Sequence, residues 1–159
     1  MKATFLRFMV ASTIALGALF TMPSCDDDDD TFDDDEMFTI SGNASGSQVV
    51  PSVTGTGTGT ITGTYNSNTR VMNYTSTWTG LSGAPTSASL YNGVSGSSGV
   101  AVGTPWTLAT PVGASGTYTG SMTLTAEQAD QLRNGNWYYS YGTTANPGGE
   151  IRGQISITD

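Results

Sequence analysis

The stretch RVMNYTSTWT, residues 70–79, alternates apolar and polar side chains with a period of two. Successive side chains of a β-strand point to opposite faces, so this pattern predicts a half-buried strand. Three large side chains share the face that is predicted to be buried: Met72, Tyr74 and Trp78. The opposite face carries small polar side chains: Asn73, Thr75, Thr77 and Thr79.

The same alternation on either side of this stretch predicts further strands at residues 38–41, 117–124 and 150–157. Residues 54–63 are a nearly strict Thr/Gly repeat, which we predict to be a strand and not a linker because threonine favours extended backbone. The glycines of that repeat leave room for bulky groups to pack against it. Residues 66–68 then predict the turn of a hairpin.

A short helix is predicted to follow the strand at residues 117–124. Thr125 and Gln128 have the spacing of a capping box, and Gly135 is a typical residue after a helix end. Ala129 and Leu132 would face the sheet. Because the remaining segments are strands and turns, the sequence predicts an all-β fold, a Greek-key β-sandwich or barrel with one short helix.

The negative charge of the chain belongs to one segment. The formal net charge is −8, and nine of the thirteen acidic residues lie in residues 26–36. Residues 37–159 hold four acidic residues, three arginines and no lysine. A nearly neutral domain of this kind offers no basic surface for nucleic acid, so we expect no nucleic-acid partner.

The chain has no histidine and one cysteine, Cys25. Histidine-based metal sites, Ser/His triads and Cys/His dyads are therefore excluded. We predict a protein that has no metal ion, no cofactor and no enzymatic activity. An enzyme based on a carboxylate pair remains an alternative, on the condition that the fold brings Glu127 and Glu150 together in a cleft.

Residues 1–24 have the features of an export signal, since Lys2 and Arg7 precede an apolar run that is too short to span a bilayer as a helix. Ser24 directly before Cys25 resembles a bacterial lipobox. This resemblance implies a lipoprotein signal peptide that is cut before Cys25, whose sulfur then carries a lipid. The alternative is a plain secretory signal with an incidental cysteine. Two positions depart from the usual lipobox: Met22 and Pro23.

Residues 25–36 are predicted to be a lipidated cysteine and an acidic tether, because like charges repel and cannot pack. Acidic residues directly after the cysteine resemble a surface-display signal of lipoproteins from Bacteroidetes-like bacteria. That resemblance implies a location in the bacterial cell envelope, on an outer-membrane lipid anchor that faces the cell surface. The alternatives are a plain spacer and a calcium site, although the run lacks the turn glycine of a Ca²⁺ loop.

The segment NPGGEIRGQI, residues 146–155, resembles the closing signature of the chordin-like (CHRD) domain family. Residues 46–51 and 123–128 resemble the opening and helix segments of that family, so the resemblance covers about residues 38–157. It implies one domain, residues 37–159, with a Greek-key sandwich that is immunoglobulin-like or superoxide-dismutase-like. The structural motif residues are Asn146, Pro147, Gly149, Glu150 and Arg152.

Family members commonly carry three histidines that are absent from this chain. The positions that match a His-x-His pair are Ser89 and Tyr91, and the position of a further histidine is Gly142. Any metal-binding role that those histidines have elsewhere is therefore not available here.

Aromatic side chains are the candidate ligand-binding residues. Trp137, Tyr139 and Tyr141 share one face of a predicted strand, which is either an exposed platform for sugars or proteins or part of the core. The core is the favoured interpretation, because both faces of a sandwich need aromatic side chains. Trp106 lies among turn residues, where it is either a binding anchor or a lid on the core.

Glu150 and Arg152 lie two residues apart on a predicted strand, so their side chains project from one face. We interpret them as an exposed structural pair; the alternative is a polar recognition spot. For the whole chain we predict a non-catalytic binding or adhesion module with an extracellular glycan or protein as its ligand. The alternative is a structural envelope lipoprotein that packs on another envelope protein.

Overall fold

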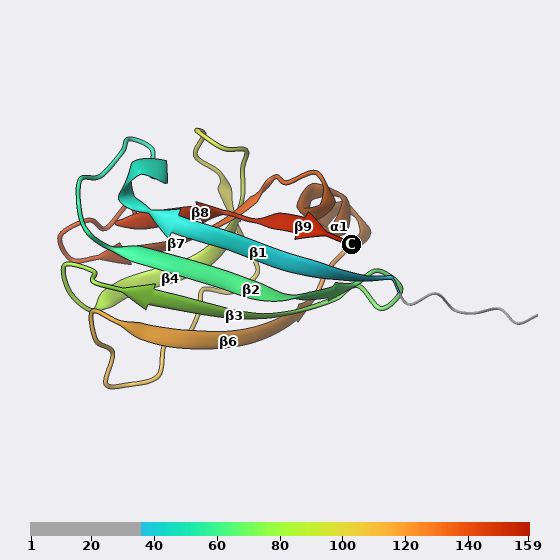
Figure 1. Cartoon of the computed structure of the whole chain (residues 1–159), viewed down its shortest axis with the longest axis horizontal. Helices are drawn as coiled ribbons and strands as arrows, with labels where there is room; N and C mark the ends of the chain where they lie inside the picture. Colours follow the sequence, from blue (N-terminus) through green and yellow to red (C-terminus); the bar gives the residue numbers. More distant parts are fainter. Residues whose placement is uncertain (1–35) are drawn as a thin grey trace, which may run out of the picture. The chain divides into compact units, whose positions relative to one another are not determined.

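An antiparallel sheet of nine strands contains about half of residues 36–159, the part of the chain that this computed structural model describes (Figure 1). The strands are hydrogen-bonded in the order β5-β4-β7-β8-β1-β2-β3-β6, and β9 pairs with β1. The described residues also form a 3₁₀ turn, η1 (Gly46–Gln48), and a helix, α1 (Ala126–Arg133). The strands are Met37–Ser45 (β1), Thr58–Asn66 (β2), Val71–Thr79 (β3), Pro85–Asn92 (β4), Val100–Val102 (β5), Gly116–Thr123 (β6), Trp137–Thr143 (β7), Ile151–Gln154 (β8) and Ser156–Thr158 (β9).

The predicted all-β fold with one short helix is confirmed. The capping box of α1 forms as predicted: the Thr125 hydroxyl accepts the Gln128 N–H at 3.2 Å, and the Gln128 side chain accepts the Thr125 N–H at 2.9 Å. Ala129 and Leu132 are buried, and Gly135 follows the helix with a φ of 69°. No helix in residues 36–159 is long and apolar enough to cross a membrane. The predictions for residues 1–35, including Cys25, lie outside the described residues.

The Thr/Gly repeat is only partly a strand. β2 begins at Thr58, which pairs with Ser45 at the end of β1, so the residues before Thr58 have no partner strand. The predicted strand at residues 54–57 is therefore wrong. The predicted packing role of the glycines is confirmed at Gly57, where a Cβ atom would lie 2.9 Å from the Leu81 side chain and 3.1 Å from Ile151.

Aromatic rings of β3 lie between glycines of the two neighbouring strands. Tyr74 is paired with Gly63 on β2 and Gly120 on β6, and Trp78 is paired in the same way with Gly59 and Gly116. A Cβ atom at residue 116 would lie 2.3 Å from the indole of residue 78, and one at residue 120 would lie 2.7 Å from the ring of residue 74. The two β6 glycines therefore make room for both rings, which are buried inside the curled sheet.

The sheet is not closed into a complete barrel. β5 and β6 stand at the two ends of the strand order, and within residues 36–159 neither pairs with the other. We call this opening between β5 and β6 the seam. The loop of residues 103–115 joins the two end strands, and it is held on the β4 side by a hydrogen bond from the Trp106 N–H to the Ala88 carbonyl at 2.8 Å.

The aromatic strand belongs to the core. Trp137, Tyr139 and Tyr141 of β7 are each 0% exposed, so the core interpretation is confirmed and the exposed platform is wrong. The physical reason is that β7 lies between β4 and β8, with this face towards the interior. The Tyr141 hydroxyl donates to Ser76 at 2.8 Å, and the Tyr139 hydroxyl donates to the carbonyl of residue 42 at 3.2 Å.

Candidate ligand-binding site

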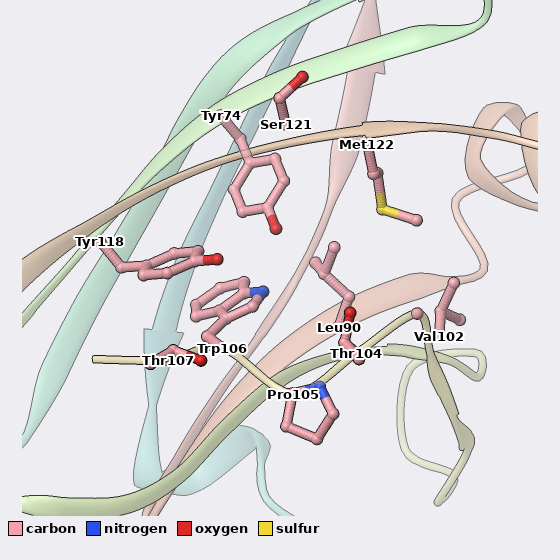
Figure 2. A pocket seen from close by; sticks show the side chains of 11 residues that line it. Tyr74, Leu90, Val102, Thr104, Pro105, Trp106, Thr107, Tyr118, Ser121 and Met122 are labelled. Carbon is pink, nitrogen blue, oxygen red and sulfur yellow. The ribbon is translucent and has the colours of Figure 1, made fainter. Parts of the chain in front are cut away.

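A pocket of about 350 Å³ lies at the seam (Figure 2). Residues from both end strands line it: β6 forms one wall, and Val102 of β5 with the start of the 103–115 loop forms the other. None of its lining residues is charged. We call this pocket the seam cavity; it is lined by Tyr74, Leu90, Val102, Gly103, Thr104, Pro105, Trp106, Thr107, Tyr118, Ser121 and Met122.

Three aromatic rings form a cluster at the inner end of the seam cavity. Trp106 and Tyr118 are stacked, with ring centroids 4.7 Å apart and planes 10° apart, and Tyr74 lies 5.5 Å from Trp106. Figure 2 shows the hydroxyl groups of both tyrosines pointing into the space above the indole. The cluster thus offers hydroxyl groups and ring edges to a ligand, while the ring faces are largely packed on one another.

The phenol of Tyr74 stays protonated at neutral pH. Burial raises its pKa to about 12, the neighbouring Tyr118 adds to the rise, and a hydrogen bond from Trp106 partly opposes it. A protonated phenol both donates and accepts hydrogen bonds, which suits recognition of an uncharged polar group.

Trp106 is mainly a lid on the core, since only 7% of its surface is exposed. Its ring meets Tyr118 on one side and Tyr141 of the core at 5.6 Å, while it also lines the seam cavity. Of the four predicted ligand-binding residues, the structure therefore places this one at a cavity and the three on β7 away from it.

The other cavity residues were not predicted from the sequence as site residues. Tyr74, Tyr118 and Met122 follow the alternating pattern of a strand whose inner face is buried, and no local signal distinguishes them from core residues. They line a cavity because β5 has only three residues and leaves the inner face of β6 half-buried. The cavity therefore depends on how distant segments pair as strands, and the periodicity of a single segment carries no information about that pairing.

Glu150 is buried and is held by uncharged donors. Its carboxylate accepts the Ser82 N–H at 2.6 Å, the Ser82 hydroxyl, the Thr143 hydroxyl at 2.6 Å and the Asn146 amide at 3.5 Å. Burial alone would raise the pKa of Glu150, but these hydrogen bonds outweigh it and hold that pKa below its ordinary value. The carboxylate therefore fixes the β3–β4 loop to the turn between β7 and β8.

Arg152 is also buried, and it serves a different loop. Its guanidinium donates to the carbonyls of Ser97 at 2.6 Å and Val94 at 2.8 Å, and it lies 3.6 Å from the centre of the Tyr138 ring. Burial lowers the pKa of Arg152, which the Tyr138 ring partly opposes, but a guanidinium remains charged in proteins. Tyr138 in turn stacks on Tyr91, with ring planes 9° apart.

The predicted exposed pair of Glu150 and Arg152 is therefore wrong. The two side chains are 4% and 3% exposed, and each is satisfied by neutral groups of a separate loop. The physical reason is that loops cover both side chains, whereas the two-residue spacing gives only the direction in which they leave the strand.

The segment that contains these charges also has a backbone requirement. Gly149 has a φ of 130°, which a side chain would disfavour, and its N–H donates to the Asn146 carbonyl at 3.1 Å. Asn146 exchanges two backbone hydrogen bonds with Thr143, each 3.2 Å long. The turn 143–149 is thus closed by its own backbone and by the Glu150 carboxylate.

A family model of the CHRD domain matches residues 40–155. The chain belongs to the CHRD domain family. No curated protein and no solved structure shows significant similarity to it. The resemblance that was based on the NPGGEIRGQI signature is confirmed, and the structure shows that the charged residues of this CHRD signature anchor loops.

The carboxylate pair on which the alternative enzyme prediction depends is not formed in residues 36–159. Glu127 is exposed on α1 and bonds to Gln131, whereas Glu150 is buried among hydroxyl groups, so the two do not form a carboxylate pair. Within residues 36–159, no three His, Cys, Asp or Glu side chains are grouped so that they could hold a metal ion. The seam cavity is the candidate site that remains in the described residues.

Replacement Glu150→Gln is predicted to lower the free energy of unfolding by about 2 kcal/mol at neutral pH, because charge-assisted hydrogen bonds are lost. The folded-state pKa of Glu150 lies below its unfolded value, so the ionised carboxylate stabilises the fold above the unfolded pKa. This stabilisation is lost as the pH falls through the folded pKa. Urea unfolding at neutral and at acidic pH should therefore show the difference from the parent chain shrinking in acid.

The matched control for this measurement is Glu127→Gln, an identical change at an exposed position of α1. It should change the free energy of unfolding by less than about 0.5 kcal/mol. A deficit for Glu150→Gln that stays the same down to acidic pH would contradict the proposed role of the ionised carboxylate.

Proposed function

We propose that this protein is a bacterial envelope lipoprotein whose CHRD domain is a non-catalytic binding or adhesion module. The ligand enters the seam cavity, and the lipid on Cys25 holds the domain at the outer membrane, facing the cell surface. Membrane attachment through the lipid and an extracellular glycan or protein are the partners of this proposal.

The observation that carries the binding proposal is the seam cavity. Its wall combines hydroxyl groups, ring edges and the Met122 side chain, with no charged residue among the lining side chains. The hydroxyl groups of Thr104 and Thr107 have no histidine or carboxylate beside them in the cavity lining, so nothing there activates a nucleophile. An uncharged pocket with a few convergent polar groups is typical of a site that binds a neutral ligand.

The N-terminal sequence supports the envelope location. Residues 1–24 have the features of a signal peptide, and Ser24 before Cys25 resembles a lipobox. The acidic residues 26–36 would hold the domain away from the membrane, since a run of like charges stays extended and solvated.

No observation specifically favours the alternative function, a structural envelope lipoprotein that packs on another envelope protein. A permanent partner would need a large, continuous apolar surface. Four large apolar side chains are exposed in residues 36–159, and they lie at the start of β1, after η1, in the β4–β5 loop and on β5: Met37, Val50, Val94 and Val100.

Cys25→Ala is predicted to abolish lipid attachment, because the thiol that carries the lipid is removed. In cells fed an alkyne-tagged fatty acid, the parent chain should be labelled and the variant should not. Protease added to intact cells should remove the domain of the parent chain. Labelling that survives in the variant, or a domain protected in intact cells, would contradict the anchor or the surface orientation respectively.

Tyr118→Leu is predicted to weaken ligand binding at least tenfold, because the half-buried ring forms a wall of the seam cavity. The full-length chain is screened against an array of neutral oligosaccharides and a phage library of short peptides, and affinities of the ligands are then measured. Tyr91→Leu is the matched control, since that half-buried ring stacks on Tyr138 and does not line the cavity.

The binding proposal fails if neither collection yields a ligand. It also fails if the ligands bind the parent chain and the Tyr118→Leu variant equally well.

A further inference from the structure

β6 is an open edge of the sheet. Its eight residues pair with β3 from Thr123 to Gly116, and it stands at the end of the strand order. In Figure 1, β6 forms the lower margin of the sheet. A strand at an edge directs every second backbone N–H and C=O away from the sheet, where another extended backbone can pair with them.

This edge lacks the features with which proteins usually block strand pairing. Edge strands are commonly short, charged, bulged or interrupted by proline. β6, with the sequence GTYTGSMT, has no charge and no proline, and its pairing with β3 is continuous. The other end strand, β5, has three residues and is thus blocked by its shortness.

The open edge borders the seam cavity. Tyr118, Ser121 and Met122 of β6 line the cavity, and the opposite wall comes from residues 102–107. Side chains of paired strands share a face, so a strand added to β6 would direct alternate side chains into the cavity. Its other side chains would continue the outer face, where β6 presents Thr117 and Thr119.

We infer that β6 binds an extended segment of a partner protein as an additional strand, with an uncharged side chain of that segment in the seam cavity. The inference rests on the proposed binding function and names its ligand. Backbone hydrogen bonds along the edge supply affinity, and the cavity supplies specificity for one side chain. A polypeptide is favoured over a glycan because only an extended backbone matches the N–H and C=O repeat of an open strand.

The residues of the cavity and of β6 also indicate which kind of segment binds. The cavity lining has no charge, so a charged side chain would lose its hydration without gaining a partner. The exposed outer side chains of β6 are small and hydroxylated, which fits a segment that alternates larger uncharged residues with small polar residues. Proline within the segment would remove a backbone donor and is excluded.

The test uses peptides that the phage library yields on the full-length chain. N-methylation of alternate backbone amides of such a peptide should weaken binding at least tenfold for one set of amides, because those amides bond to β6. N-methylation of the amides between them should have less effect. In the protein, Thr119→Lys should weaken binding at least fivefold by placing a charge on the edge strand.

Thr62→Lys is the matched control for the lysine variant. It makes the same change at an exposed position of β2, which is paired on both sides by β1 and β3. Peptide affinity should be unchanged in this variant, and both variants should retain the unfolding free energy of the parent chain within about 0.5 kcal/mol.

The outcomes separate this inference from the proposed function. Peptides that depend on Tyr118 but tolerate N-methylation at every position would overturn strand addition and leave the cavity as a binding site. Binding of oligosaccharides alone would also overturn the inference. If sedimentation shows a dimer of the full-length chain that Thr119→Lys dissociates, the edge serves a second copy and the partner-protein inference is wrong. Absence of any ligand would overturn both proposals.

Discussion

The packing of aromatic rings over glycines determines how this sheet is filled. Tyr74 and Trp78 are paired with glycines on both neighbouring strands, and their rings pack directly against Gly120 and Gly116 of β6. Trp106 completes the cluster from the loop that joins β5 to β6. The seam is therefore closed by side chains and not by a ladder of hydrogen bonds, which leaves both a cavity and a free strand edge at the same place.

The CHRD signature and the candidate site have different tasks. Glu150 and Arg152 each lose their hydration on burial and gain hydrogen bonds, Glu150 from the β3–β4 loop and Arg152 from the β4–β5 loop. The signature therefore fixes these loops to the sheet. The aromatic cluster at the seam lies elsewhere and contains none of the signature residues.

Local patterns predicted several strands and the helix because these depend on neighbouring residues, whereas β4 and β5 were not predicted. The alternation around Tyr74 and the capping box of Thr125 are examples, and both were confirmed. Burial was harder to predict, since alternation separates two faces without saying what covers each one. Glu150 and Arg152 were expected to be exposed, yet loops from distant sequence cover them. The seam cavity was not predicted because it results from the short length of β5, a property of pairing between distant segments.

β6 is an open edge of the sheet beside the seam cavity, where side chains and not strand pairing fill the space between β5 and β6. Amide hydrogen exchange of the free full-length chain, measured by NMR along residues 117–123, tests this arrangement most directly. We predict an alternating pattern, in which amides bonded to β3 exchange slowly and the amides between them exchange quickly. Slow exchange at every position of β6 would mean that another backbone already covers this edge, and it would contradict the account.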